Sequence, residues 1–177
     1  KIEERLMKEL EKDVSLRVEQ KDAENWIVSG RGELHLSILI ENMRREGFEL
    51  QVSKPEVIIK EIDGVKCEPY EEVLIEAPTD TVGAVIESLA SRDGQMINMK
   101  ALENNTKLEY IVPSRGLIGF VNEFLILTKG YGIINHTFKE YGPVNPSPVG
   151  ERKLGVLVSM ENGKATAYGL GALEDRG

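Results

Sequence analysis

The chain has 177 residues, 41% of them hydrophobic and 29% charged, which fits one or two small globular domains. Its formal net charge of −8 argues against a protein that coats nucleic acid non-specifically. It does not exclude RNA contacts made by a few arginines on one edge of the molecule.

The first third of the sequence predicts a helix, a hairpin and a second helix. Residues 2–13 repeat apolar side chains at i, i+4 and i+8, the spacing of an amphipathic helix. Alternation over residues 14–19 and an apolar run at 26–29 predict a hairpin. A helix is expected over residues 33–46, and residues 48–62 are largely extended. This α-β-β-α-β order lacks only a first strand to match the ferredoxin-like β-α-β-β-α-β pattern.

The pattern restarts after residue 63 and runs through a complete β-α-β-β-α-β unit. The predicted order is a strand at 70–77, a helix at 81–92, strands at 95–102 and 107–112, a helix at 117–128 and a strand at 133–141. Residues 65–69 read as a connector between the two halves.

A third segment follows the proline-rich linker at residues 142–148. Asn162-Gly163 predicts the turn of a hairpin over residues 155–168, in a segment too short to bury a core alone. The sequence therefore predicts an α+β protein with two ferredoxin-like (βαββαβ) domains, the first lacking its N-terminal strand. Their limits are residues 1–63 and 64–143, and residues 144–177 begin an incomplete β-rich C-terminal domain.

Two turns of similar composition join a strand to a helix. The first is Ser29-Gly30-Arg31-Gly32, and the second is Ser114-Arg115-Gly116. Glycine in such a turn lets two elements approach closely, and exposed turns carry function more often than cores do. Arg31 and Arg115 are therefore functional candidates, with the alternative that each braces its own domain through a carboxylate or a helix end.

Residues that would carry catalysis or hold a cofactor are sparse. Gly163-Lys164 lacks the upstream glycine and the following hydroxyl residue of a P-loop. His35 and His136 stand in no cluster of metal ligands, and His35 either packs its turn or acts as a base or an RNA contact. We therefore predict no catalytic residue, no cofactor and no metal in this chain.

The single cysteine, Cys67, excludes an internal disulfide and fits a reducing cytosol. No apolar run is long enough to span a bilayer. We therefore expect a cytoplasmic protein without a membrane partner.

Longer motifs carry a family resemblance. Residues 29–36, Ser-Gly-Arg-Gly-Glu-Leu-His-Leu, and residues 42–50, Asn-Met-Arg-Arg-Glu-Gly-Phe-Glu-Leu, resemble the third domain of translational GTPases of the TypA/BipA family. Residues 113–120, Pro-Ser-Arg-Gly-Leu-Ile-Gly-Phe, resemble the domain of that family equivalent to the fifth of elongation factor G. Residues 150–177 are similar to the start of its C-terminal domain.

The resemblance implies a function that the residues alone do not give. Members of this family are GTPases that bind the bacterial ribosome near the factor site and are linked to stress adaptation and ribosome assembly. The chain would then be a C-terminal fragment that docks on ribosomal RNA and proteins and relays conformational change from an upstream GTPase domain. GTP and Mg²⁺ would bind in that upstream domain, and no family catalytic residue matches a position here.

Positive side chains that could meet RNA are few in this acidic chain. The candidate contacts are Arg31, Arg44, Arg45, Arg115 and Lys129. Two rival interpretations keep the same fold. One is a stand-alone pair of ferredoxin-like domains that binds a small ligand or acts as an enzyme, which would require a pocket with convergent polar groups. The other is a structural spacer without affinity for RNA.

Overall fold

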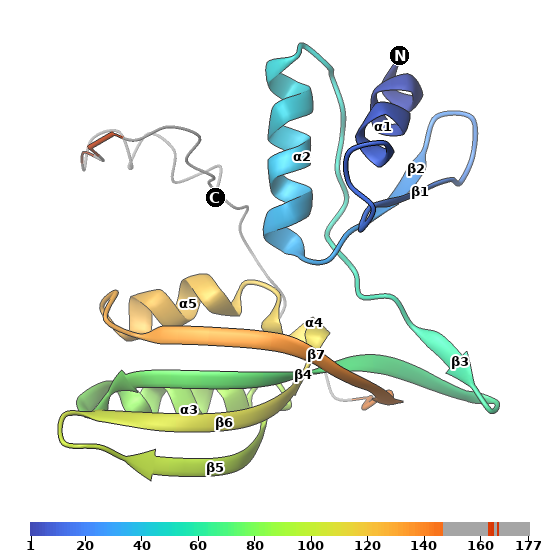
Figure 1. The fold of residues 1–177 in the computed structure, drawn as a ribbon. Helices are drawn as coiled ribbons and strands as arrows, with labels where there is room; N and C mark the ends of the chain where they lie inside the picture. Colours follow the sequence, from blue (N-terminus) through green and yellow to red (C-terminus); the bar gives the residue numbers. More distant parts are fainter. Residues whose placement is uncertain (147–162, 165, 167–177) are drawn as a thin grey trace. The chain divides into compact units, whose positions relative to one another are not determined.

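The computed structural model describes residues 1–146, 163–164 and 166 of the chain. Among these, residues 1–54 and residues 55–146 form two compact units, each an α+β arrangement of the ferredoxin-like type (Figure 1). The hairpin expected over residues 155–168 and most of the predicted C-terminal segment lie outside the described residues.

The first unit contains the four elements predicted before residue 47. They are α1 (Ile2–Leu10), β1 (Arg17–Gln20), β2 (Trp26–Ser29) and α2 (Glu33–Arg45), with β1 and β2 paired as an antiparallel hairpin. The helices place Leu6, Leu39 and Met43 in a common core with Leu16. Helix α1 and strand β1 are each shorter than predicted, because the Asp13 carboxylate accepts the Ser15 N–H and holds a turn between them.

The extended strand predicted over residues 48–62 is wrong for most of its length. Only β3 (Lys60–Ile62) is a strand, and it pairs with the following strand, in the second unit. Phe48 and Leu50 still pack on the core of the first unit. Apolar periodicity marked their burial correctly, but a strand also needs a neighbouring backbone edge, and residues 48–59 have none in the described structure.

The second unit has the complete β-α-β-β-α-β order that the sequence predicts. Its elements are β4 (Val65–Pro78), η1 (Thr79–Thr81), α3 (Val82–Ala90), β5 (Gln95–Ala101), β6 (Asn105–Pro113), α4 (Ser114–Leu117), α5 (Phe120–Leu127) and β7 (Ile133–Pro143). The antiparallel sheet runs β5-β6-β4-β7, with β3 added beside the start of β4.

Two predicted boundaries in the second unit need correction. Residues 65–69, expected as a connector, belong to β4, because β3 and the end of β7 pair with them. The helix expected over residues 117–128 begins only at Phe120, as α5, and the turn predicted before it forms the short helix α4; the left-handed Gly119, with φ of 74°, separates the two. Gly119 thereby sets the direction of α5 relative to α4.

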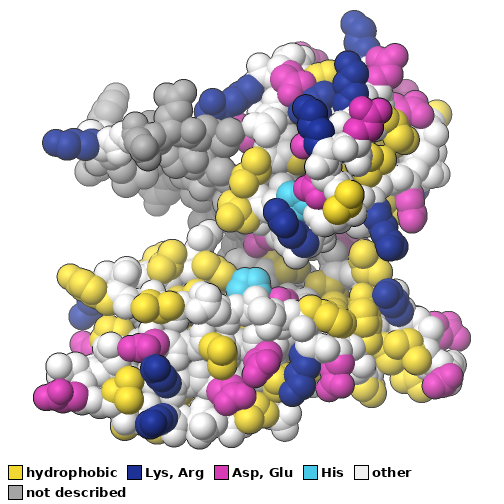
Figure 2. Space-filling view, viewed as in Figure 1, with side chains coloured by type: hydrophobic (Ala, Val, Ile, Leu, Met, Phe, Trp, Pro, Cys, Tyr) yellow, Lys and Arg dark blue, Asp and Glu magenta, His cyan; other side chains and the backbone are white. Residues whose placement is uncertain are grey.

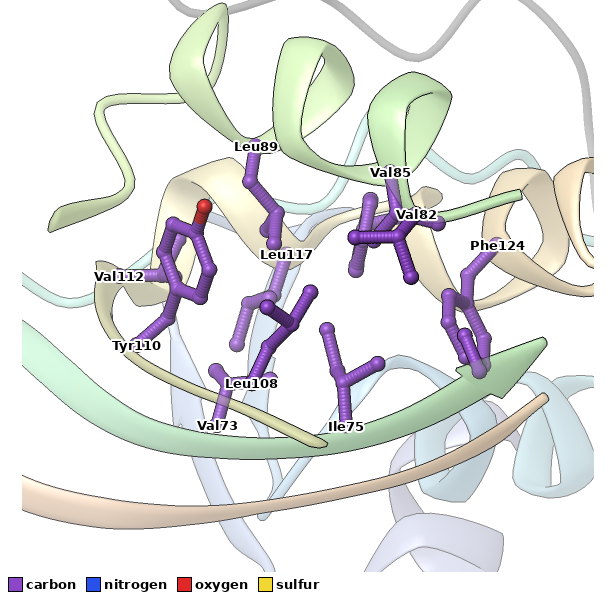
Figure 3. Packing of buried hydrophobic residues seen from close by; sticks show 12 residues of the cluster. Val73, Ile75, Val82, Val85, Leu89, Leu108, Tyr110, Val112, Leu117 and Phe124 are labelled. Atoms are coloured by element: carbon purple, nitrogen blue, oxygen red, sulfur yellow. The ribbon is translucent and has the colours of Figure 1, made fainter. Parts of the chain in front are cut away.

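The core of the second unit lies between the sheet and its helices. Figure 3 shows Val73 and Ile75 of β4 and Leu108 and Tyr110 of β6 pointing from the sheet toward Val85 and the other apolar side chains of α3. Alternate residues of each strand face this core, as the pleat requires. Phe120 and Phe124 of α5 are fully buried in the same cluster.

We expect Leu39→Ala to lower the free energy of unfolding of the first unit by about 2–5 kcal/mol, because Leu39 is 6% exposed and lies in the core. Leu34→Ala, on the same helix but 59% exposed, is the matched control and should change stability by less than about 0.5 kcal/mol. Chemical denaturation measures both values. Equal effects would show that the wrong face of α2 has been assigned to the core.

Candidate functional site

The first Arg-Gly turn depends on close packing at Gly30. A Cβ atom at Gly30 would stand 2.8 Å from Nδ1 of His35 and 2.9 Å from Cδ2 of Leu36. A larger residue at position 30 would therefore displace these two side chains of α2. Gly32, which precedes α2, has open space around it and an extended φ of 176°. The first glycine of the motif is therefore a packing requirement, and the second is not.

His35 ties this turn to the connection between α1 and β1. Its Nδ1 accepts a hydrogen bond from the Arg31 backbone N–H at 3.4 Å, so its Nε2–H donates to Oδ2 of Asp13, 2.6 Å away. Bonds from the side chain and backbone of Ser15, and then the bond from His35, lower the pKa of Asp13 to about 2. Both ring nitrogens are engaged, which favours the packing role of His35 over a role as a base.

Three candidate cations lie at the two ends of α2. Arg31 and Arg44 are exposed, and in residues 1–146 neither guanidinium has an ion-pair or hydrogen-bond partner. Arg45 is also exposed and forms an ion pair with Glu41 one turn earlier, with Nε and Oε1 3.2 Å apart. The helix has 13 residues and spans roughly 20 Å, so Arg31 and the Arg44–Arg45 pair form separate points of positive charge.

Sequence reasoning missed Arg5, which fastens α1 to the end of α2. Its Nε and Nη2 donate to the two carboxylate oxygens of Glu46 at 2.6 and 2.8 Å, and its Nη1 donates to Glu9 at 2.7 Å. The bond with Glu46 is the main reason that the pKa of Arg5 is raised and that of Glu46 is lowered. The i,i+4 spacing of Arg5 and Glu9 is visible in the sequence, but the partnership with Glu46 is not.

The second Arg-Gly turn directs its arginine into the unit. Arg115 donates from Nε to Oε2 of Glu68 at 2.6 Å and from Nη2 to Oδ2 of Asp93 at 2.7 Å. The Glu68 side chain is completely buried, and the Arg115 side chain is mostly so. Of the two roles that the sequence left open for Arg115, this geometry favours bracing.

The same carboxylate holds the chain that leaves the last strand. The Asn145 N–H donates to Oε1 of Glu68 at 3.1 Å, and Arg115 donates from Nη2 to the Asn145 carbonyl oxygen at 3.1 Å. Tyr70 donates its hydroxyl to the Pro143 carbonyl oxygen at 2.9 Å. The start of β4, the corner at α4 and the end of β7 are thereby joined by one polar cluster.

Gly116 permits this corner to close. A Cβ atom there would lie 2.5 Å from the Arg92 carbonyl oxygen, which is rigid backbone. Arg92 in turn donates from Nη1 to the carbonyl oxygens of Gly116 and Ile118, and from Nη2 to Glu123 at 2.6 Å. Arg92 is buried and satisfied, so it serves the fold of the second unit.

Lys129 occupies a different part of the second unit. It follows α5, and its Nζ lies 4.0 Å from Oδ2 of Asp80. Asp80 comes just after the end of β4, whereas the Glu68 partner of Arg115 lies near the start of that strand. Because Lys129 and Asp80 are both highly exposed, water screens their attraction and Lys129 stays accessible. Sequence reasoning did not select its neighbour Tyr131, which is exposed as well.

A second polar cluster joins β4, β7 and α4. Nδ1 of His136 lies 2.8 Å from Oε1 of Glu71, and this bond is the main reason that the pKa of His136 is raised above 6.5. Burial of the Glu71 carboxyl would raise its pKa, but bonds from His136 and Ser114 outweigh burial and lower it below 4.5. His136 is an exposed residue of β7, a strand that the sequence predicts, but its partner Glu71 could not be seen from the sequence.

Features of other kinds of site are few in the described part of the chain. Residues 1–146 hold no group of three metal-ligating side chains, and no helix among them is long and apolar enough to cross a membrane. A shallow depression of about 210 Å³ in the first unit is lined by Lys1, Glu4, Arg5, Lys8, Glu46 and Phe48. Its central cation, Arg5, already has two carboxylate partners.

The exposed charges of both signs are mixed. Figure 2 shows lysine and arginine side chains interspersed with acidic ones over the visible face of each unit. Of the candidate cations, Arg31, the Arg44–Arg45 pair and Lys129 are therefore separate points of exposed positive charge among acidic side chains. Such points suit a few placed phosphate contacts better than broad attraction to a polyanion.

Known proteins share both units. The family model described as "Elongation Factor G, domain III" matches residues 1–54, and the one described as "Elongation factor G C-terminus" matches residues 65–152. A crystal structure of a protein from Thermus thermophilus covers 82% of this chain and 38% of its own, with a TM-score of 0.56 and 18% identity, which shows the fold alone. The two units are thus domains of the elongation factor G type.

Whole-chain relatives define the family more narrowly. The chain is 63% identical to the large ribosomal subunit assembly factor BipA of Bacillus subtilis, over 100% of this chain and 29% of that protein. It is 53% identical to the protein of the same name from Escherichia coli K12, over 98% of this chain and 29% of that protein. The chain therefore belongs to the TypA/BipA family of elongation factor G-like proteins and spans about 29% of the length of these relatives.

We expect Arg115→Met to lower the free energy of unfolding of the second unit by about 3–5 kcal/mol, because it leaves the buried Glu68 carboxylate without its cation. Arg44→Met removes an exposed arginine and is the control, with a change below about 0.5 kcal/mol. Chemical denaturation measures both. If the free energy of unfolding falls by the same small amount in both variants, Arg115 does not brace the unit.

The stabilising effect of the Glu71–His136 pair should depend on pH. The raised pKa of His136 gives stability that is present below pH 6.5 and is lost as pH rises through the folded-state value. The lowered pKa of Glu71 gives stability that is present above pH 4.5 and is lost as pH falls through the folded-state value.

The parent should therefore melt at a higher temperature than His136→Gln, and the difference between the two melting temperatures should be largest between pH 4.5 and 6.5. The difference should shrink on either side of that window. Thermal melts at a series of pH values measure it, and a difference that stays constant would contradict charge pairing between these two residues.

Proposed function

We propose that this chain is the ribosome-binding portion of a TypA/BipA-like translational GTPase. The observation that carries the proposal is its similarity, over essentially its whole length, to large ribosomal subunit assembly factors. In this proposal the two units dock at the factor site of the bacterial ribosome, in the cytoplasm, and contact ribosomal RNA and proteins. They relay conformational change from a GTPase domain elsewhere in the protein, where GTP and Mg²⁺ bind.

The internal bracing of each unit supports a relay. Arg5 fastens α1 to α2 in the first unit, and Arg115 joins three segments of the second through Glu68. A domain whose elements are tied by such bonds moves as a body, so a displacement at one end is transmitted to the other instead of being absorbed.

Arg31 is the best-placed of the candidate RNA contacts. The hydrogen bond to His35 fixes its backbone, while its guanidinium is exposed and has no partner among the described residues. The backbone at this position is therefore ordered before binding, and only the rotamer freedom of the side chain is lost when the guanidinium binds a phosphate. It can therefore contribute to RNA binding even though the chain as a whole is acidic.

Ribosome co-sedimentation of the full-length protein with GTP tests this assignment. Arg31→Glu should weaken binding several-fold and reduce the dependence of log affinity on log salt concentration by about one unit, with the melting temperature unchanged. Lys21→Glu, an equal charge reversal in the turn at the far end of the β1–β2 hairpin, is the control and should bind like the parent.

The outcomes separate two failures. If the parent protein does not co-sediment with ribosomes, the proposed function is wrong. If it does, and Arg31→Glu binds as well as Lys21→Glu, then docking occurs through other residues. A fall in the melting temperature of Arg31→Glu would support a bracing role for Arg31 in place of the contact.

A further inference from the structure

We infer that the loop between α5 and β7, residues 129–132, is a built RNA contact: the ring of Tyr131 stacks on an unpaired base, and Lys129 binds a neighbouring phosphate. This inference rests on the proposed function and deepens it, because it names the chemistry of one contact with ribosomal RNA. The loop is called the Lys129–Tyr131 tip below.

The tip is held rigidly by the end of α5. The Gly130 N–H donates to the Leu125 carbonyl oxygen at 2.7 Å and the Lys129 N–H to that of Ile126 at 3.0 Å, the two bonds of a Schellman motif. Thr128, fully buried, accepts a hydrogen bond from the Gly132 N–H through its side-chain oxygen at 3.1 Å. The backbone on both sides of Tyr131 is therefore fixed.

Close packing at Gly132 sends the tyrosine outward. A Cβ atom at Gly132 would lie 2.4 Å from the ring of Phe124 and 2.6 Å from Oγ1 of Thr128, so the backbone itself is pressed against the core there. Tyr131, one residue earlier, is 79% exposed. On its other side, Gly130 has no side chain and open space around it, so the ring is left uncovered.

Lys129 stands where a helix favours glycine. It is the residue after the C-cap of α5 and has a left-handed φ of 55°, a conformation that disfavours a residue with a side chain. The Lys129 side chain is 73% exposed, and its charge partner among the described residues is Asp80, 4.0 Å away and screened by water. The two Schellman bonds hold this conformation, and it leaves the Lys129 side chain exposed to a ligand.

An exposed aromatic ring next to a cation matches single-stranded RNA. Every base has a face on which a ring can stack, and a cation close to the ring can bind a phosphate beside the stacked base. The neighbouring Ile126, 77% exposed in the last turn of α5, is the feature that a protein partner would use. It therefore serves to distinguish the two kinds of partner.

Four variants of the full-length protein test the contact by ribosome co-sedimentation. Tyr131→Ser removes the ring and should weaken binding at least about fivefold, while Tyr131→Trp keeps a stacking surface and should bind like the parent. Lys129→Gly should also weaken binding, with a smaller salt dependence and an unchanged or higher melting temperature, because glycine suits a φ of 55°. Asp63→Gly, which also places glycine at an exposed residue with a positive φ, here 52°, is the control for the backbone change and should leave binding unchanged.

The identity of the partner is read by a photoreactive phenylalanine analogue at position 131. Crosslinking to ribosomal RNA, with Ile126→Ser binding normally, supports the inference. Crosslinking to a ribosomal protein, or a loss of binding in Ile126→Ser equal to that of Tyr131→Ser, assigns the tip to a protein partner and overturns it. Parent-like binding by Tyr131→Ser or Lys129→Gly also overturns it, whereas a parent that does not bind ribosomes would overturn the proposed function itself.

Discussion

The buried ion pair between Glu68 and Arg115 is the constraint on which the second unit depends. A carboxylate without solvent must be neutralised locally, and here the Arg115 cation and the Asn145 backbone N–H come from separate segments. These segments are α4 and the chain after β7, and both hold the carboxylate at the start of β4. Neither can move away without stranding the charge, so the pair makes the corner of the unit a single rigid body, and the close approach at Gly116 is what allows it.

The two Arg-Gly turns use the same residues in opposite ways. In the first turn the backbone of Arg31 is held by His35 and its side chain is exposed. In the second the side chain of Arg115 is held, by Glu68 and Asp93. The difference lies in whether the fold brings a carboxylate beside the turn. Those carboxylates are far from Arg115 in the sequence, so the motif alone could not distinguish a contact residue from a brace.

Local patterns predicted most of the fold and little of the site. Periodicity gave the helices and strands of the second unit and the core face of α2, because burial on one side imposes a regular spacing. It failed for residues 48–59, where burial of Phe48 and Leu50 does not require a strand, and at Gly119, whose left-handed turn leaves no periodic signal. Tyr131 was missed because its exposure follows from packing at Gly132, which composition does not reveal.

Strand β4 also determines when the second unit can form during synthesis. It lies between β6 and β7, and its residue Val73 pairs with His136, far along the chain. During translation, the second edge of β4 is therefore covered only after β7 has left the ribosome, when almost the whole unit has been synthesised. During that interval an apolar strand has an open edge, the condition in which nascent chains pair wrongly or recruit a chaperone. A protein related to ribosome assembly factors thus has a topology that leaves one of its own strands exposed for a long part of its translation.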